Sequence, residues 1–203
     1  MPHIGPYTLH AIETGRFGLD GGAMFGIVPK PLWSKRIEPD AQNRIPLSVR
    51  CLLLKGHGRV VLVDTGIGDT FEDTKYQSLY AVDHSDATLA ESLHDCGVAP
   101  ADVTDVVLTH LHFDHCGGGT QRTDAGAEPT FPNATYHVQR QHWDWATDPN
   151  PNEKGSFLSE TFAPLERSDQ LHLVDGAGQL FPYVDVALVH GHTESQQVVT
   201  VHD

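Results

Sequence analysis

Residues 109–115 read Thr109-His110-Leu111-His112-Phe113-Asp114-His115 and bring imidazoles and a carboxylate close together in the chain. His110 and His112 are two positions apart, so in an extended segment both side chains point to the same side. Neutral imidazole and carboxylate groups suit zinc and its first-row neighbours as ligands. This spacing predicts a metal site formed by His110, His112, Asp114 and His115, and a solvated histidine-rich loop is the alternative.

The residues on either side of this stretch favour a site at the end of a strand. Asp105 to Leu108 is a short apolar run with β-branched residues, which predicts a buried strand. Gly117-Gly118-Gly119 follows the histidines and permits close approach of the backbone. The strand would therefore deliver the ligand-type side chains to its carboxyl end, where sites lie in layered α/β folds.

Composition places the chain among ordinary globular proteins. Its 203 residues are 39% hydrophobic and 20% charged, which predicts one domain over residues 1–203. A formal net charge of -14 argues against a nucleic-acid partner. No apolar run approaches the roughly 20 residues that span a bilayer, so no membrane partner is expected. The residues Met1 to Pro6 lack the basic head and apolar stretch of a signal peptide, which favours a cytoplasmic location.

The cysteines Cys51, Cys96 and Cys116 are scattered and odd in number, so they predict neither a disulfide framework nor a zinc-binding pair. Cys116 directly follows His115 and is a conceivable soft metal ligand. A small buried residue is the favoured interpretation of Cys116.

Hydrophobic periodicity and turn residues predict an α/β or α+β arrangement of layers. Strands are expected at residues 7–13, 47–55, 60–64, 103–108, 134–138, 171–174 and 184–189, and from 197 onward. Helices are expected at 87–96 and 139–146, with an ambiguous segment at 157–165. Loops are expected at 15–26, 71–83, 121–132 and 148–155, where Gly, Pro and polar residues gather.

The pattern H-x-H-x-D-H at residues 110–115 resembles the signature of the metallo-β-lactamase superfamily. Asp64-Thr65-Gly66, which follows an apolar run, is similar to the first motif of that family, and Gly191-His192-Thr193 is similar to its third. The segment from Gly21 to Lys30 resembles a lactonase-type branch, the YtnP-like quorum-quenching lactonases. The likeness covers most of residues 7–203.

This resemblance implies a four-layer αβ/βα sandwich and a metal site shared by distant residues. It implies that His110, His112 and His192 bind one metal and leave an open fourth position, as in catalytic zinc sites. His190 lies two residues before His192 and competes for the role, but the Gly-His-Thr context favours His192. Asp114 and His115 would begin a second metal position.

Asp64 has two interpretations. An aspartate at the end of a strand can simply cap a turn. The resemblance favours a sharper role, in which the Asp64 carboxylate accepts a hydrogen bond from a metal-binding histidine and orients it.

The resemblance also implies a reaction. Two zinc ions about 4 Å apart can share a hydroxide that attacks a carbonyl or phosphoryl group at neutral pH. Manganese, cobalt or iron could replace zinc, because site geometry and availability decide metal identity. Asp114 is the candidate catalytic residue, which would hold the hydroxide and pass its proton to the leaving group. Di-iron redox relatives carry Glu where this chain has His112, so hydrolysis is favoured.

The expected activity is opening of a lactone or ester, with an N-acyl-homoserine lactone as the leading small-molecule substrate. An organophosphate or aryl-ester hydrolase on the same site is the alternative. Met24, Phe25 and Trp33 would form an apolar wall of the substrate pocket, with core packing as an equal alternative. If the segment containing them were exposed, it would favour a homodimer.

One feature departs from the family pattern. The second metal position also needs an aspartate that bridges the metals and a final histidine, both C-terminal to His192. The sequence ends at Asp203, soon after His192. The expectation is therefore a domain without its last strands and helices, and a non-catalytic metal-binding remnant is a rival interpretation.

Overall fold

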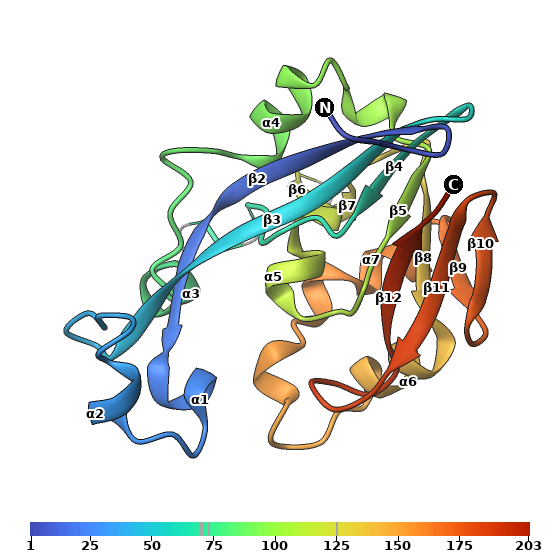
Figure 1. Ribbon diagram of the computed structural model, residues 1–203. Coiled ribbons are helices and arrows are strands. Elements are labelled where there is room, and N and C mark those ends of the chain that lie inside the picture. Colours follow the sequence, from blue (N-terminus) through green and yellow to red (C-terminus); the bar gives the residue numbers. More distant parts are fainter. Residues whose placement is uncertain (70, 73, 125) are drawn as a thin grey trace.

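The computed structural model describes residues 1–69, 71–72, 74–124 and 126–203 (Figure 1). The strands are β1 (His3–Ile4), β2 (Tyr7–Asp20), β3 (Arg44–Gly56), β4 (Arg59–Val63), β5 (Asp105–Val107), β6 (Thr120–Thr123), β7 (Gly126–Pro129), β8 (Thr135–Gln139), β9 (Leu171–Val174), β10 (Gly178–Phe181), β11 (Val184–Val189) and β12 (Gln196–Val201). The α-helices are α1 (Gly21–Phe25), α2 (Lys30–Trp33), α3 (Lys75–Leu79), α4 (Leu89–Asp95), α5 (Phe113–Cys116), α6 (Arg140–Thr147) and α7 (Ala163–Glu166). Short 3-10 turns are η1 (Pro100–Asp102), η2 (Gly117–Gly119), η3 (Lys154–Ser156) and η4 (Ser159–Thr161).

The strands form a seven-stranded sheet in the order β1-β2-β3-β4-β5-β8-β9 and a three-stranded sheet in the order β10-β11-β12. The pairs β4–β5, β5–β8 and β8–β9 are parallel, and the remaining pairs of these two sheets are antiparallel. The carboxyl end of β5 therefore opens onto the same edge as the ends of β4 and β8. This edge is the one predicted to carry the metal site.

Residues 15–26 were expected to form a loop, and this prediction is wrong. β2 continues to Asp20, because β3 offers it a partner as far as the pair Asp20–Arg44. The register shifts between Glu13 and Gly15, where Gly15 has a φ of 126° that only glycine adopts easily. Figure 1 shows the resulting long ribbon of β2 and β3, with α1 and α2 at its far end.

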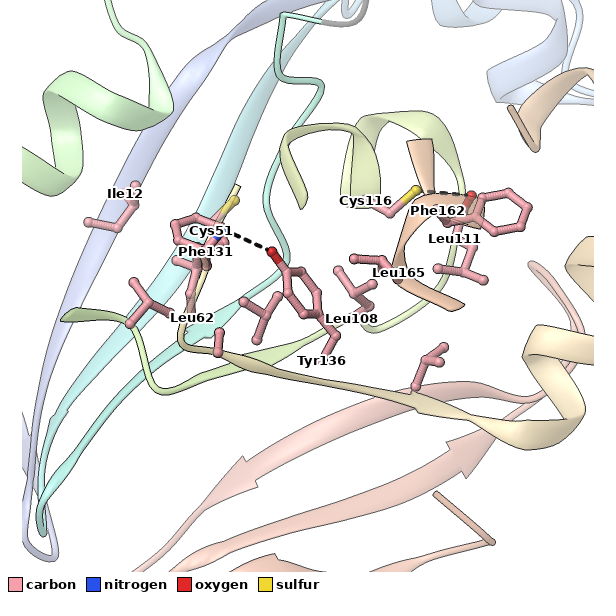
Figure 2. Close-up of a cluster of buried hydrophobic side chains, with 14 of the residues drawn as sticks. Ile12, Cys51, Leu62, Leu108, Leu111, Cys116, Phe131, Tyr136, Phe162 and Leu165 are labelled. Atoms are coloured by element: carbon pink, nitrogen blue, oxygen red, sulfur yellow. Dashed lines mark hydrogen bonds between the residues drawn. The ribbon is translucent and has the colours of Figure 1, made fainter. Parts of the chain in front are cut away.

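Two hydrophobic cores lie on opposite faces of the large sheet. In β5, Val106 packs in the core that includes side chains of α4, α6 and α7, whereas Val107 packs against the three-stranded sheet through Phe181 and Val184. Figure 2 shows the first core, in which the Tyr136 hydroxyl accepts a hydrogen bond from the Phe131 amide. The same hydroxyl donates to the Gly119 carbonyl at 2.8 Å, which secures the glycine segment behind the predicted site.

A third core surrounds Phe113, which follows His112 in the histidine-rich stretch of residues 109–115. The phenyl ring of Phe113 lies 4.6 Å from the Tyr80 ring and 5.0 Å from the Phe71 ring, centroid to centroid. Residues 71–83 were expected to be an irregular surface loop, but they contain α3 and the buried Phe71. This segment is ordered because its aromatic side chains pack on α5.

Residues 121–132 were likewise expected to be a loop. The structure shows a small antiparallel sheet there, formed by β6 and β7 with Thr120 opposite Pro129. The predicted hairpin at Gly56-His57-Gly58 is confirmed, since β3 and β4 pair on either side of His57 and Gly58. Both turn residues have positive φ, as a tight hairpin requires.

The mixed α/β architecture agrees with the expected sandwich. Three of its layers are present in the described ranges: the helices, the large sheet and the small sheet. On the outer face of the small sheet, Val189 and Val198 are 40% and 44% exposed, so no layer within the described ranges covers these two side chains. No helix in the described part of the chain is long and apolar enough to cross a membrane.

Candidate metal centre

The histidines of residues 109–115 follow the end of β5. After Leu108 the chain leaves the sheet, and His112 is extended, with φ −65° and ψ 145°, just before α5 begins at Phe113. β12 holds this segment from the other sheet, because the Gln197 amide donates to the Thr109 carbonyl at 2.9 Å. The buried Gln197 side chain also donates to the Leu108 carbonyl at 2.7 Å.

Three imidazoles from two loops converge at this point. One ring nitrogen from each of His110, His112 and His192 lies within 4.8 Å of the others. The loop that joins β11 and β12 carries His192 and reaches beneath α5 in Figure 1. His112 Nδ1 lies 3.1 Å from His192 Nε2, so these two atoms face each other. The structure thus brings together the three histidines that the resemblance assigned to one metal.

His110 supplies the clearest test of whether these residues fit a metal. Its ring is 1% exposed and its Nε2 atom has no hydrogen-bond partner. A buried polar atom without a partner costs free energy, so it calls for an explanation such as a bound ion. Burial, reinforced by the neighbouring His115 and His112 rings, lowers the pKa of His110 and keeps it neutral, which is the form that binds metals.

Hydrogen bonds place the proton of the His110 ring on Nδ1. The Thr109 hydroxyl donates to Asp64 Oδ2 at 2.9 Å, so its oxygen accepts from His110 Nδ1 at 3.0 Å. The lone pair of His110 therefore resides on Nε2 and points into the cluster. A metal held by one ring nitrogen from each of His110, His112 and His192 would fit this donor set.

Asp64 orients a second ring as well. Its Oδ2 accepts a hydrogen bond from His115 Nδ1 at 2.8 Å, and its Oδ1 accepts from the Thr109 amide at 2.8 Å. The carboxylate therefore does more than cap a turn. His115 Nε2 lies 3.4 Å from Asp114 Oδ2, so the two residues predicted to begin a second metal position lie next to each other.

Backbone contacts lock the Asp64 turn onto α5. The Thr65 amide donates to the His115 carbonyl at 2.7 Å, and the Gly118 amide donates to the Gly66 carbonyl at 3.1 Å. Residues 44–203 of this chain, which include this turn and the histidines, match the sequence profile of the metallo-beta-lactamase superfamily. The chain belongs to that superfamily.

Curated relatives of the superfamily share parts of the chain. An N-acyl homoserine lactonase of Bacillus cereus is 27% identical over 168 residues, which are 78% of this chain and 60% of the relative. The N-acyl homoserine lactonase AttM of Azorhizobium caulinodans is 39% identical over 66 residues, which are 32% of this chain and 22% of the relative. The chain thus spans 60% or less of the length of these two lactonases.

Solved structures confirm the metallo-β-lactamase fold. A probable metal-dependent hydrolase from Staphylococcus aureus superposes with a TM-score of 0.88 at 30% identity, over 100% of this chain and 71% of that chain. AidC, a dizinc quorum-quenching lactonase, superposes with a TM-score of 0.76 at 20% identity, over 100% of this chain and 69% of that chain. The second likeness concerns the fold alone.

Other predicted candidates lie outside the cluster. His190 turns away, since its ring is paired with Glu194 at 2.8 Å and is about half exposed. Cys116 is fully buried and its thiol lies 3.3 Å from the Leu111 carbonyl. Burial raises the pKa of Cys116 to about 12, so it remains a thiol and packs as a small residue rather than acting as a ligand.

The residues predicted to line a substrate pocket lie in α1 and α2. Trp33 is buried, and its ring stacks on Phe25 at 5.0 Å between centroids. It also packs closely on Gly21, where any side chain would collide with the indole. Met24 is 47% exposed. Their role toward a substrate stays a prediction.

Sequence reasoning missed His142, which connects the two ligand loops. Its Nε2 accepts the Leu111 amide at 2.8 Å, and its Nδ1 donates to the Glu194 carbonyl at 2.6 Å. The ring must be neutral to accept at one nitrogen and donate at the other. Burial lowers the pKa of His142 to about 4, which agrees with that requirement. The sequence pattern of residues 139–146 predicted a helix and gave no indication of a role for His142.

We expect His142 to make the metal-free protein less stable in acid. The folded state keeps His142 neutral down to about pH 4, whereas the unfolded chain protonates it below about pH 6.5. The unfolded state then binds more protons, so this stability is complete above pH 6.5 and is lost as the pH falls toward 4. The loss is on the order of 3 kcal/mol.

Urea unfolding of wild type and His142→Gln, measured with a chelator at several pH values, will check this expectation. Other histidines titrate in both proteins, so the difference between the two curves reports His142. Parallel curves across the acid range would contradict it.

Proposed function

We propose that this chain is a metal-dependent hydrolase of a lactone or ester, with an N-acyl-homoserine lactone as its leading substrate. One observation carries the proposal: His110, whose buried Nε2 has no hydrogen-bond partner, brings a ring nitrogen within 4.8 Å of ring nitrogens of His112 and His192. The matches to N-acyl homoserine lactonases support the substrate class.

Zinc bound by these imidazoles would polarise the substrate carbonyl and supply hydroxide near neutral pH. We assign the His110, His112 and His192 rings to one metal position, and Asp114 and His115 to a second. Manganese, cobalt or iron are the alternative metals. An imidazole binds a metal in its neutral form, and burial lowers the pKa of both His110 and His112 in that direction.

Asp114 is the proposed catalytic residue. It lies in the first turn of α5, and its side chain is 22% exposed beside His115. This position leaves part of the carboxylate accessible to solvent. Asp114 would accept the proton of the attacking water and return it to the leaving alkoxide as the ring opens. The acidic net charge agrees with a small uncharged substrate rather than a nucleic acid.

A substrate panel tests the proposal. The zinc-loaded chain is assayed with N-hexanoyl-homoserine lactone, an aryl ester and a phosphotriester, and zinc content is measured by elemental analysis after gel filtration. We expect ring opening with the highest kcat/KM for the lactone and loss of turnover with a chelator. Preference for the phosphotriester or the aryl ester would replace the lactonase with the alternative hydrolase. Bound zinc without any turnover would favour the non-catalytic metal-binding interpretation.

A further inference from the structure

We propose that Glu153 is a positioning residue for metal binding, because its carboxylate keeps the proton of His112 on Nε2 and leaves Nδ1 free for the metal. This inference rests on the proposed function for its metal. Residues 148–155 were predicted only to be a loop, and neither motif spacing nor the family resemblance pointed to Glu153.

The two side chains lie within hydrogen-bond distance and are mostly shielded from solvent. Glu153 Oε1 lies 3.1 Å from His112 Nε2, and the two side chains are 16% and 8% exposed. A carboxylate only accepts hydrogen bonds, so His112 must donate from Nε2. The lone pair then resides on Nδ1, the atom that lies 3.1 Å from His192 Nε2 inside the cluster.

The second carboxylate oxygen is also occupied. The Trp145 indole donates to Glu153 Oε2 at 2.9 Å, so the two oxygens serve different donors. Asn150 presents the residue, since its side-chain oxygen accepts from the Glu153 amide at 3.1 Å. Phe157, four residues later, packs on the His112 ring with centroids 4.8 Å apart. The loop thus holds His112 by a hydrogen bond and by packing.

All three histidines of residues 109–115 donate a hydrogen bond from one ring nitrogen to an oxygen acceptor. His110 Nδ1 donates to the Thr109 hydroxyl oxygen, and His115 Nδ1 donates to Asp64 Oδ2. Glu153 completes the set for His112. Acceptors behind metal-binding histidines fix the tautomer, and their loss typically costs ten- to a hundredfold in metal affinity.

The test compares Glu153→Gln with Glu160→Gln, an exposed carboxylate in the same region of the chain. A glutamine offers only one acceptor oxygen, so it cannot serve both His112 and Trp145. Zinc affinity is measured by competition with a chromophoric chelator. We expect it to fall ten- to a hundredfold in Glu153→Gln and to stay within about twofold in Glu160→Gln. Glu153→Asp, which keeps a carboxylate, should recover part of the loss.

Nitrogen-15 NMR of histidine-labelled, metal-free protein gives a readout that does not depend on activity. We expect His112 to be protonated at Nε2 in the wild type and to show mixed tautomers in Glu153→Gln. Wild-type His112 protonated at Nδ1 would overturn the inference, whether or not the variant folds. So would unchanged zinc affinity and an unchanged tautomer in Glu153→Gln. A wild type that binds no zinc would instead overturn the metal part of the proposed function, and the tautomers would still decide the role of Glu153.

Discussion

Replacing His110 with alanine will abolish zinc binding at the three-histidine position and reduce hydrolysis by more than about a hundredfold. Side chains that only orient a metal ligand are already worth ten- to a hundredfold, so removal of the most buried ligand must cost more. His110 is also the ring whose Nε2 has no other partner in the described structure, so no protein group replaces the metal there.

Unfolding measurements give a second readout of His110. A ligand present at a hundredfold excess over its Kd stabilises the native state by about 2.7 kcal/mol. Wild type should show such a gain on adding zinc, and His110→Ala should not. His190→Ala is the matched control, because it removes an exposed imidazole from the loop that carries His192. Equal zinc stabilisation of wild type and His110→Ala would refute the assigned site.

Gly117→Ala will destabilise the fold by about 3 kcal/mol or more, even though Gly117 has an ordinary helical conformation with φ of −58°. A methyl group there would overlap the backbone carbonyl of Ile67. The overlap involves backbone, which has no alternative rotamer. It would force the Asp64-Thr65-Gly66 turn away from α5, so zinc affinity should fall as well.

Gly155→Ala is the control for this prediction, because nothing lies within 4 Å of the added methyl and its φ is not positive. The free energy of unfolding, taken from urea titrations, should change by less than about 0.5 kcal/mol in the control. A loss in Gly117→Ala no larger than that in Gly155→Ala would show that the two segments can separate at little cost.

Local patterns were reliable where the partner of a segment is its neighbour in the chain. The hairpin at His57 and Gly58 is an example, since turn geometry alone specifies how β3 meets β4. Patterns failed where the partner is distant. The glycines of residues 15–26 predicted a loop, but strand β3 pairs with this segment and extends β2 to Asp20. Phe71 was predicted to lie in a polar loop, but it is buried against Phe113, which lies far along the chain.

The sequence by itself determined the superfamily and the metal-binding stretch, because H-x-H-x-D-H places its ligand types within one strand end and one turn. It also indicated His192 and Asp64 through their local motifs. Only the tertiary structure decided which ring nitrogen of His110, His112 and His115 carries the proton. That choice depends on Thr109, Asp64 and Glu153 as acceptors, and on Gln197 and His142 holding the loops together. Glu153, Gln197 and His142 are distant from the stretch in the chain, and spacing carries no information about hydrogen bonds made across a fold.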